Sequence, residues 1–135
     1  MATKIFVNFP VKDLKKTINF FTQLGYTFNA QFTDENATCM IISEDIYAML
    51  LVEKFWHTFT DKTICDPATS KEVMIALTTD SRKQVDEFVD KAIKAGATEP
   101  KPAQDHGFMY SRNFEDLDGH SWSILFMEPS FIQPA

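Results

Sequence analysis

The chain has 135 residues, a formal net charge of −6 and 44% hydrophobic residues, which is typical of one globular domain that buries a core. Lysine and arginine never form a cluster of more than two neighbours, so binding to nucleic acid or to an anionic membrane is not expected. No apolar run approaches the ~20 residues that span a bilayer, and the first residues lack the layout of a secretory signal. The two cysteines, Cys39 and Cys65, have no metal-type spacing. We therefore predict a cytoplasmic protein with reduced thiols.

The first half of the chain reads as a strand, a helix and three further strands. Residues 4–11 alternate between two faces of a predicted strand. One face carries Ile5, Val7 and Phe9, and the other carries Phe6 and Asn8. Asp13 is a predicted N-cap, and apolar residues at helical spacing continue to a stop at Gly25. The three strands are expected over residues 26–33, 38–43 and 47–53.

The second half repeats this order. A strand is predicted over residues 72–79, and Ser81 with Gln84 has the spacing of a capping box before a helix that ends at Gly96. Two last strands are expected over residues 109–114 and 121–127, joined by a tight turn at residues 116–119. Superposing the two patterns makes Phe6 and Met74 equivalent positions.

This repeat predicts an α+β fold made of two βαβββ units, forming a U-shaped trough of mixed β-sheet with the helices outside. We expect one domain over residues 1–135, with half-modules at about 4–53 and 71–129 and a linker at 54–70. A seam between two sheets is where a small-molecule cavity tends to form. The linker carries Trp56 with its neighbours Phe55 and Phe59, which we interpret as dimer contacts, with a lid over the trough as the alternative.

Two motifs carry a family resemblance. Val11-Lys-Asp13 is followed by Phe20-Phe21 and by Leu24-Gly25-Tyr26, and Phe114-Glu-Asp-Leu-Asp-Gly-His-Ser-Trp122 comes late in the chain. With these motifs, nearly the whole chain resembles the vicinal oxygen chelate superfamily of glyoxalase I, extradiol dioxygenases, and fosfomycin- and bleomycin-resistance proteins. The resemblance implies the trough fold and a homodimer with ligand clefts shared between subunits.

Enzymes of that superfamily hold a divalent metal through His or Glu side chains on the first and last strands of each half. The resemblance places these positions on Phe6, Leu50, Met74 and Ser123. Phenylalanine and leucine have no donor atom, methionine suits only soft ions, and a lone serine is a weak ligand. We therefore predict no metal, no cofactor and no catalytic residue, and the sequence leaves open whether the protein is an enzyme.

The leading hypothesis is a metal-free protein that binds an aromatic or amphipathic small molecule in an apolar trough, as bleomycin-resistance proteins do. One alternative is a metal-dependent lyase similar to lactoylglutathione lyase, or a dioxygenase, with displaced ligands such as His106. Another is a dimeric scaffold whose trough is plugged. The predicted ligand-binding residues combine apolar side chains with a few small polar ones: Phe6, Asn8, Leu50, Trp56, Met74, Met109, Ser111, Asn113 and Ser123.

Overall fold

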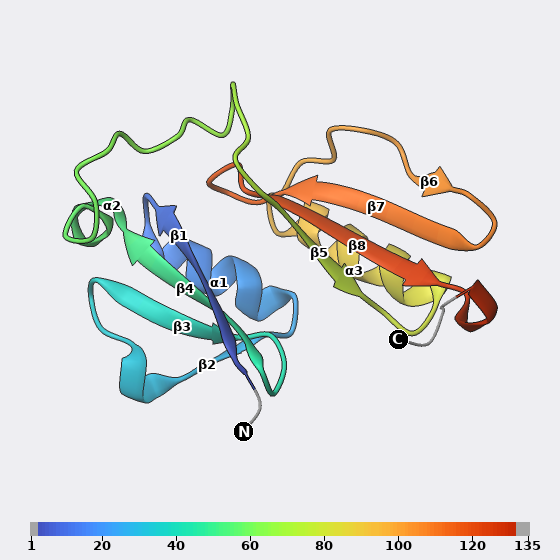
Figure 1. Cartoon of the computed structure of the whole chain (residues 1–135), viewed down its shortest axis with the longest axis horizontal. Coiled ribbons are helices and arrows are strands. Elements are labelled where there is room, and N and C mark those ends of the chain that lie inside the picture. The colour runs from blue at the N-terminus through green and yellow to red at the C-terminus, as the bar shows by residue number, and fades with distance from the viewer. Residues whose placement is uncertain (1–2, 132–135) are drawn as a thin grey trace. The chain divides into compact units, whose positions relative to one another are not determined.

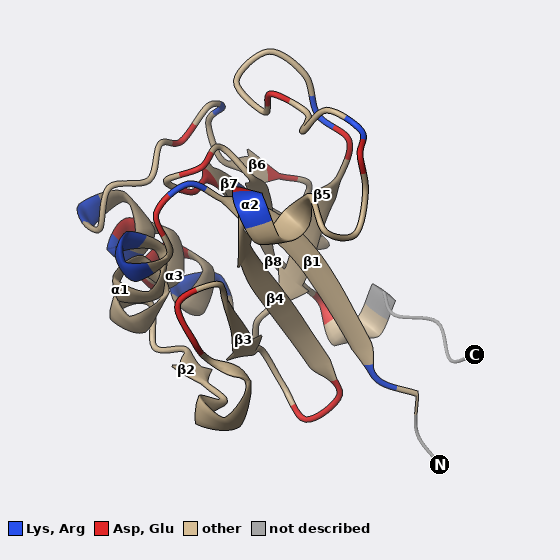
Figure 2. Ribbon diagram, turned by 90° about the vertical axis from the view of Figure 1, so that its left-hand side faces the viewer, with Lys and Arg blue, Asp and Glu red and all other residues tan. Residues whose placement is uncertain are grey.

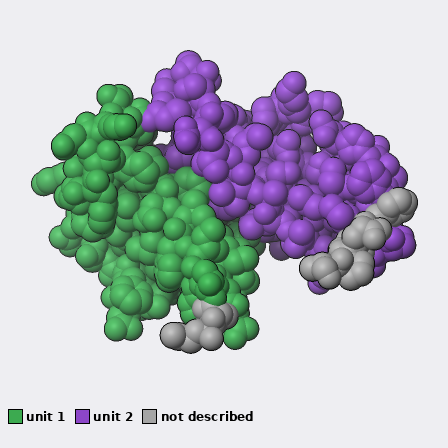
Figure 3. Space-filling model, viewed as in Figure 1, with its two compact units in different colours: residues 1–64 green, residues 65–135 purple. Residues whose placement is uncertain are grey.

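A computed structural model describes residues 3–131. The chain divides into two compact units, residues 1–64 and 65–135 (Figure 3). Each unit contains one four-stranded mixed sheet and one long helix (Figure 1), which confirms the predicted α+β class and the βαβββ repeat. Within the described residues, no helix is both long enough and apolar enough to cross a membrane.

The first unit is built around a sheet with strand order β1-β4-β3-β2, in which β1 runs parallel to β4. The helix α1 begins where predicted, because the Asp13 carboxylate accepts a hydrogen bond from the Lys16 backbone N–H at 3.1 Å. It ends before Gly25, whose φ of 100° lies in the left-handed region. The elements are β1 (Ile5–Val11), α1 (Leu14–Gln23), β2 (Thr27–Phe28), η1 (Ala30–Phe32), β3 (Ala37–Ile41), β4 (Ile46–Val52) and α2 (Glu53–Trp56).

The strand expected over residues 26–33 is wrong in its second half. Only Thr27 and Phe28 pair with β3, and a turn of 3-10 helix follows. The Asn29 side chain accepts a hydrogen bond from the Gln31 backbone N–H at 2.9 Å, which caps this turn. An asparagine that bonds to the backbone two residues later favours a turn over a strand.

The two faces of the first sheet differ in burial. Phe9 and its register partner Leu50 are buried in the core with Phe20 and Phe21 of α1. The opposite face, here called the distal face, carries Phe6 and Asn8 and their register partners on β4. Phe6 is 49% exposed, so this face is not closed by the core of the unit.

The second unit has the same plan, with strand order β5-β8-β7-β6 and β5 parallel to β8. The Ser81 hydroxyl accepts a hydrogen bond from the Gln84 backbone N–H at 3.1 Å, as the capping-box spacing predicted. The helix buries Val85 and Val89 completely against the sheet. The elements are β5 (Met74–Thr78), α3 (Arg82–Lys94), β6 (Gln104–Asp105), β7 (Met109–Glu115), β8 (Ser121–Met127) and η2 (Pro129–Phe131).

Arg112 of β7 anchors the helix side of this second sheet. Its guanidinium donates two hydrogen bonds to the Glu99 carboxylate, both at 2.9 Å, and it also pairs with Asp86 and Asp90 of α3 at 3.2 and 3.0 Å. The bidentate hydrogen bond to Glu99 is the largest cause that raises the pKa of Arg112 above its ordinary value, and the bonds to Asp86 and Asp90 raise it further. The cluster ties α3, β7 and the loop after α3 together, so we assign it a structural role.

Candidate functional site

A cavity of about 330 Å³ lies over the distal face of the first sheet. Asn8 of β1 and Leu51 of β4 form its floor, since Leu51 pairs with Pro10, two residues from Asn8 and on the same face. Trp56 of α2 and the following Phe59 and Thr60 form its walls. All five residues belong to the first unit, and the cavity is partly open to solvent.

The walls are held by a tight turn after α2. The Phe59 backbone N–H donates to the Trp56 carbonyl at 3.0 Å, and the Thr58 hydroxyl donates to the Phe55 carbonyl at 2.7 Å. His57 Nδ1 lies 3.2 Å from the Thr60 carbonyl oxygen. The rings of Phe55 and Phe59 pack edge to face with centroids 5.3 Å apart. These contacts place two aromatic rings beside the floor without help from a distant segment.

Only two side chains at the cavity are polar, and neither is charged. The Asn8 amide donates from Nδ2 to the Phe6 carbonyl at 3.3 Å, which leaves Oδ1 as an acceptor. The Thr60 hydroxyl oxygen accepts from the Lys62 backbone N–H at 3.2 Å and keeps its own hydrogen to donate. An apolar pocket with a few placed polar groups is the usual form of a small-molecule site.

Four predicted ligand-binding residues have a defined place in this unit. Asn8 and Trp56 line the cavity, whereas Phe6 lies on the distal face outside it, stacked on Tyr47 with ring centroids 4.7 Å apart. Leu50 does not lie on this face: it pairs with Phe9 and is 1% exposed, in the core. The placement of Leu50 in the trough was therefore wrong: its side chain faces α1, and the next residue, Leu51, faces the distal side.

Three lining residues are absent from the predicted ligand-binding residues, although Phe59 was considered with Trp56 as a dimer contact or lid: Leu51, Phe59 and Thr60. Leu50 and Leu51 are both leucines, so the alternation pattern gives no basis for choosing between them. For Phe59 a signal did exist, because it follows Trp56 by three residues in the segment after the strand. On one turn of helix that spacing brings both rings to the same side.

The other five predicted residues share one face of the second sheet, the face away from α3. Met74 of β5 and Ser123 of β8 lie there, and Ser123 pairs directly with Asn113 of β7. Ser111 and Met109 follow at alternate positions of β7. Met74 is 71% exposed, whereas Ser111 is buried. The Asn113 Oδ1 atom is buried and, among the described residues, accepts no hydrogen bond.

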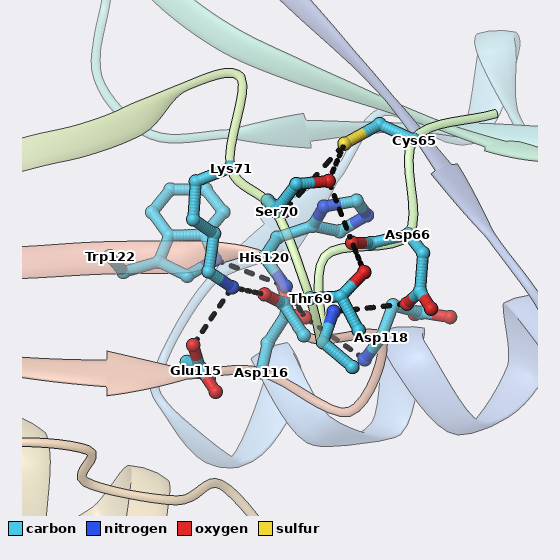
Figure 4. A network of polar contacts seen from close by, with 12 residues as sticks. Cys65, Asp66, Thr69, Ser70, Lys71, Glu115, Asp116, Asp118, His120 and Trp122 are labelled. Atoms are coloured by element: carbon cyan, nitrogen blue, oxygen red, sulfur yellow. Dashed lines mark hydrogen bonds and ion pairs between the residues drawn. The ribbon is translucent and has the colours of Figure 1, made fainter.

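The turn at residues 116–119 is organised by the buried carboxylate of Asp116 (Figure 4). Asp116 Oδ1 accepts from the backbone N–H groups of Asp118 and His120, both at 3.0 Å, and Oδ2 accepts from Trp122 Nε1 at 2.9 Å. Burial raises the pKa of Asp116 above its ordinary value, and the nearby His120 and the hydrogen bonds from Trp122 and the His120 backbone offset this rise only in part. With all of these acceptor sites in use, the carboxylate has the bonding of a structural group.

Residues 65–71, which precede β5, pack against this turn and bond to it. The Lys71 ammonium donates to the Gly119 carbonyl and pairs with Glu115 at 2.8 Å. Pro67 fills the space beside Gly119, where an added Cβ would lie 3.2 Å from the proline ring. Cys65, at the start of the segment, is exposed, and its Sγ lies 3.3 Å from the Ser70 hydroxyl oxygen. These contacts are local to the segment.

Comparisons with known proteins agree with the observed fold. A family model described as the Glyoxalase/Bleomycin resistance protein/Dioxygenase superfamily matches residues 5–124. The hypothetical protein SA1046 from S. aureus has 26% sequence identity and a TM-score of 0.79, over 93% of this chain and 95% of that one. The fosfomycin resistance protein FosX from Mesorhizobium loti has 15% identity and a TM-score of 0.68, over 96% of each chain. No curated protein sequence matches.

A third similar structure is a glyoxalase/bleomycin resistance protein/dioxygenase family enzyme from Burkholderia phytofirmans PsJN. It has 16% identity and a TM-score of 0.77, over 93% of this chain and 99% of that chain. At sequence identities this low, a similar structure establishes the fold alone. The chemistry depends on the residues present at the site.

The residues present do not fit the divalent metal that this fold implies. Phe6 and Met74 lie at equivalent places on β1 and β5, the edge strands of their sheets, and neither offers the hard oxygen or nitrogen donor that such a metal needs. Ser123 adds one weak hydroxyl. Across residues 3–131, no three His, Cys, Asp or Glu side chains gather into a group that could hold a metal ion.

Proposed function

Because the chain belongs to the Glyoxalase/Bleomycin resistance protein/Dioxygenase superfamily, we propose that it is a metal-free member that binds an aromatic or amphipathic small molecule. The observation that carries this proposal is the cavity over the distal face of the first sheet, with its leucine floor and two aromatic walls. The residues that line the cavity include no His, Cys, Asp or Glu that could ligate a metal, which supports ligand binding over metal-dependent chemistry.

The size of the cavity indicates the size of the ligand. A cavity of about 150 Å³ lined by apolar side chains is large enough for benzene. The volume of about 330 Å³ found here is roughly twice that, which suits one substituted ring or two fused rings. The Trp56 and Phe59 rings are well suited to stack on such a ligand.

We further propose that the two units act as one domain and that the protein is a cytoplasmic homodimer. Ile5 and Ile46 are register partners with exposed side chains, and neighbouring apolar side chains at the surface favour an interface. Both cysteines are free thiols, in keeping with a reducing compartment. Sedimentation velocity tests the dimer, and a monomeric mass at micromolar concentration would contradict it.

Ligand binding is expected to change the fluorescence of Trp56. The only other tryptophan, Trp122, is buried and bonded to Asp116, so it serves as a constant background. We expect at least one compound in a mixed panel of neutral, cationic and anionic aromatic compounds to quench the signal saturably. The Trp56→Phe variant should lose the response. A panel with no saturable response in the native protein would contradict the proposal.

Phe59 and Phe32 form a matched pair for locating the site. Both are exposed phenylalanines of the first unit, at 70% and 56%, but only Phe59 lines the cavity. Phe59→Ala should weaken binding of the quenching compound by about tenfold, because it removes one aromatic wall. Phe32→Ala should leave the affinity unchanged. Equal effects of the two substitutions would place the ligand elsewhere.

The metal-free assignment predicts that the protein carries no stoichiometric metal. The purified protein should contain well under one equivalent of metal by elemental analysis, and adding Ni²⁺, Zn²⁺ or Co²⁺ should not raise its melting temperature. The Cys65→Ser variant is the control, because an exposed thiol binds Zn²⁺ weakly by itself. A metal-dependent rise in melting temperature that survives in this variant would overturn the assignment.

A further inference from the structure

We infer that the cavity selects a neutral aromatic ligand that carries a hydrogen-bond donor, and that Asn8 is the residue that recognises this donor. The inference rests on the proposed function, since it names the class of molecule that the same cavity takes. It concerns the polarity of the ligand, which the fold by itself leaves open.

The absence of charge at the cavity argues for a neutral ligand. All five lining residues are uncharged, and neither β1 nor β4 carries a charged residue along its length (Figure 2). A charged group that leaves water for an apolar surface needs a countercharge or several hydrogen bonds to offset its lost hydration. This cavity offers one amide and one hydroxyl. The net charge of −6 belongs to the chain as a whole, and none of it lines the cavity.

The orientation of Asn8 argues for a donor on the ligand. Its Nδ2 donates to the Phe6 carbonyl on the same strand, which turns the amide and leaves Oδ1 without a hydrogen-bond donor among residues 3–131. A ligand that covers Asn8 removes water from this oxygen, so a ligand without an N–H or O–H group would leave a desolvated acceptor unpaired. A phenol, an indole or an aromatic amide supplies the missing donor.

Four probes with the same two fused rings separate these requirements. They are 2-naphthol, which is neutral with a donor; 2-methoxynaphthalene, which is neutral without one; 2-naphthoate, an anion; and 2-naphthylmethylammonium, a cation. Isothermal titration calorimetry at neutral pH on the full chain gives the four affinities. We expect 2-naphthol to bind at least about tenfold tighter than each of the other three, a factor typical of one satisfied hydrogen bond.

Two substitutions at Asn8 then test the recognising atom, at an exposed position where neither change disturbs the core. Asn8→Leu should bring 2-naphthol and 2-methoxynaphthalene to within about twofold of each other, because the acceptor is gone. Asn8→Asp should strengthen binding of the ammonium probe by about tenfold and weaken that of 2-naphthoate, because it adds a carboxylate.

The possible outcomes distinguish this inference from the proposed function. If the charged probes or 2-methoxynaphthalene bind the native protein as tightly as 2-naphthol, the inference fails and the proposed binding function stands. If the preference for 2-naphthol survives in Asn8→Leu, then Asn8 is not the recognising residue. If none of the four probes binds and the wider panel leaves Trp56 fluorescence unchanged, both the inference and the proposed function fail.

Discussion

Replacing Asp116 with alanine is expected to lower the free energy of unfolding by about 3 kcal/mol, since buried donors would lose a charged acceptor. The carboxylate holds the Asp118 and His120 N–H groups on one oxygen and the Trp122 indole N–H on the other, and Trp122 is buried. Urea denaturation followed by tryptophan fluorescence measures the change, with the Trp122 environment as a direct reporter.

Asp34 provides the matched control for this substitution. Its carboxylate also accepts two backbone N–H bonds, from Asn36 at 2.8 Å and Ala37 at 3.1 Å, but the residue is exposed. Water replaces the lost bonds at an exposed site, so Asp34→Ala should cost less than about 1 kcal/mol. Asp116→Asn should fall between the two, because one oxygen remains. Equal losses for Asp116→Ala and Asp34→Ala would show that burial of the carboxylate contributes nothing.

Replacing Arg112 with methionine is expected to cost a similar amount, about 3 kcal/mol, at the helix side of the second sheet. The Arg112 side chain is 13% exposed and pairs with three carboxylates, those of Asp86, Asp90 and Glu99. Methionine keeps much of the volume and removes the charge, so the three carboxylates then repel each other. High salt screens this repulsion, and the loss should be smaller in about 1 M sodium chloride than at low ionic strength.

The control is Arg82→Met, which removes a similar arginine–carboxylate pair at an exposed position. Arg82 makes a two-pronged bond to Asp105, and the side chains are 38% and 55% exposed. Exposed ion pairs contribute about 0–1 kcal/mol, so this substitution should be nearly neutral in a denaturation experiment. A loss for Arg112→Met that is no larger than that for Arg82→Met would contradict the structural role of the cluster.

Much of the fold could be predicted from local patterns. The caps at Asp13 and Ser81 and the stop at Gly25 are one-residue signals with a direct geometric cause, and all three lie where they were expected. The alternation of β1 and β8 likewise placed Asn8 and Ser123 on the faces away from the helices. The short β2 was missed because the side chain of Asn29 bonds to the backbone, which competes with strand pairing.

The sequence predicted a cavity at the seam between the two sheets, whereas the cavity described here lies within the first unit, and only two of its lining residues were among the predicted ligand-binding residues. Asn8 and Trp56 were expected at a ligand site, and they do line the cavity together, but the expected Leu50 lies in the core. Alternation fixes which residues of one strand share a face, but not how that strand pairs with its neighbour. With two adjacent leucines in β4, only the parallel pairing with β1 decides that Leu51 joins Asn8.

The amino-acid pattern alone defines the repeated βαβββ plan, its helix boundaries and the lack of strong metal donors at Phe6, Met74 and Ser123. These are properties of residue type and short-range spacing, which act before the chain is folded. The tertiary structure decided the register of β4, the position of Trp56 and Phe59 over Asn8, and the gathering of three acidic side chains on Arg112. Each of these depends on which strands and turns pack together, because side chains distant in sequence acquire shared surroundings only through that packing.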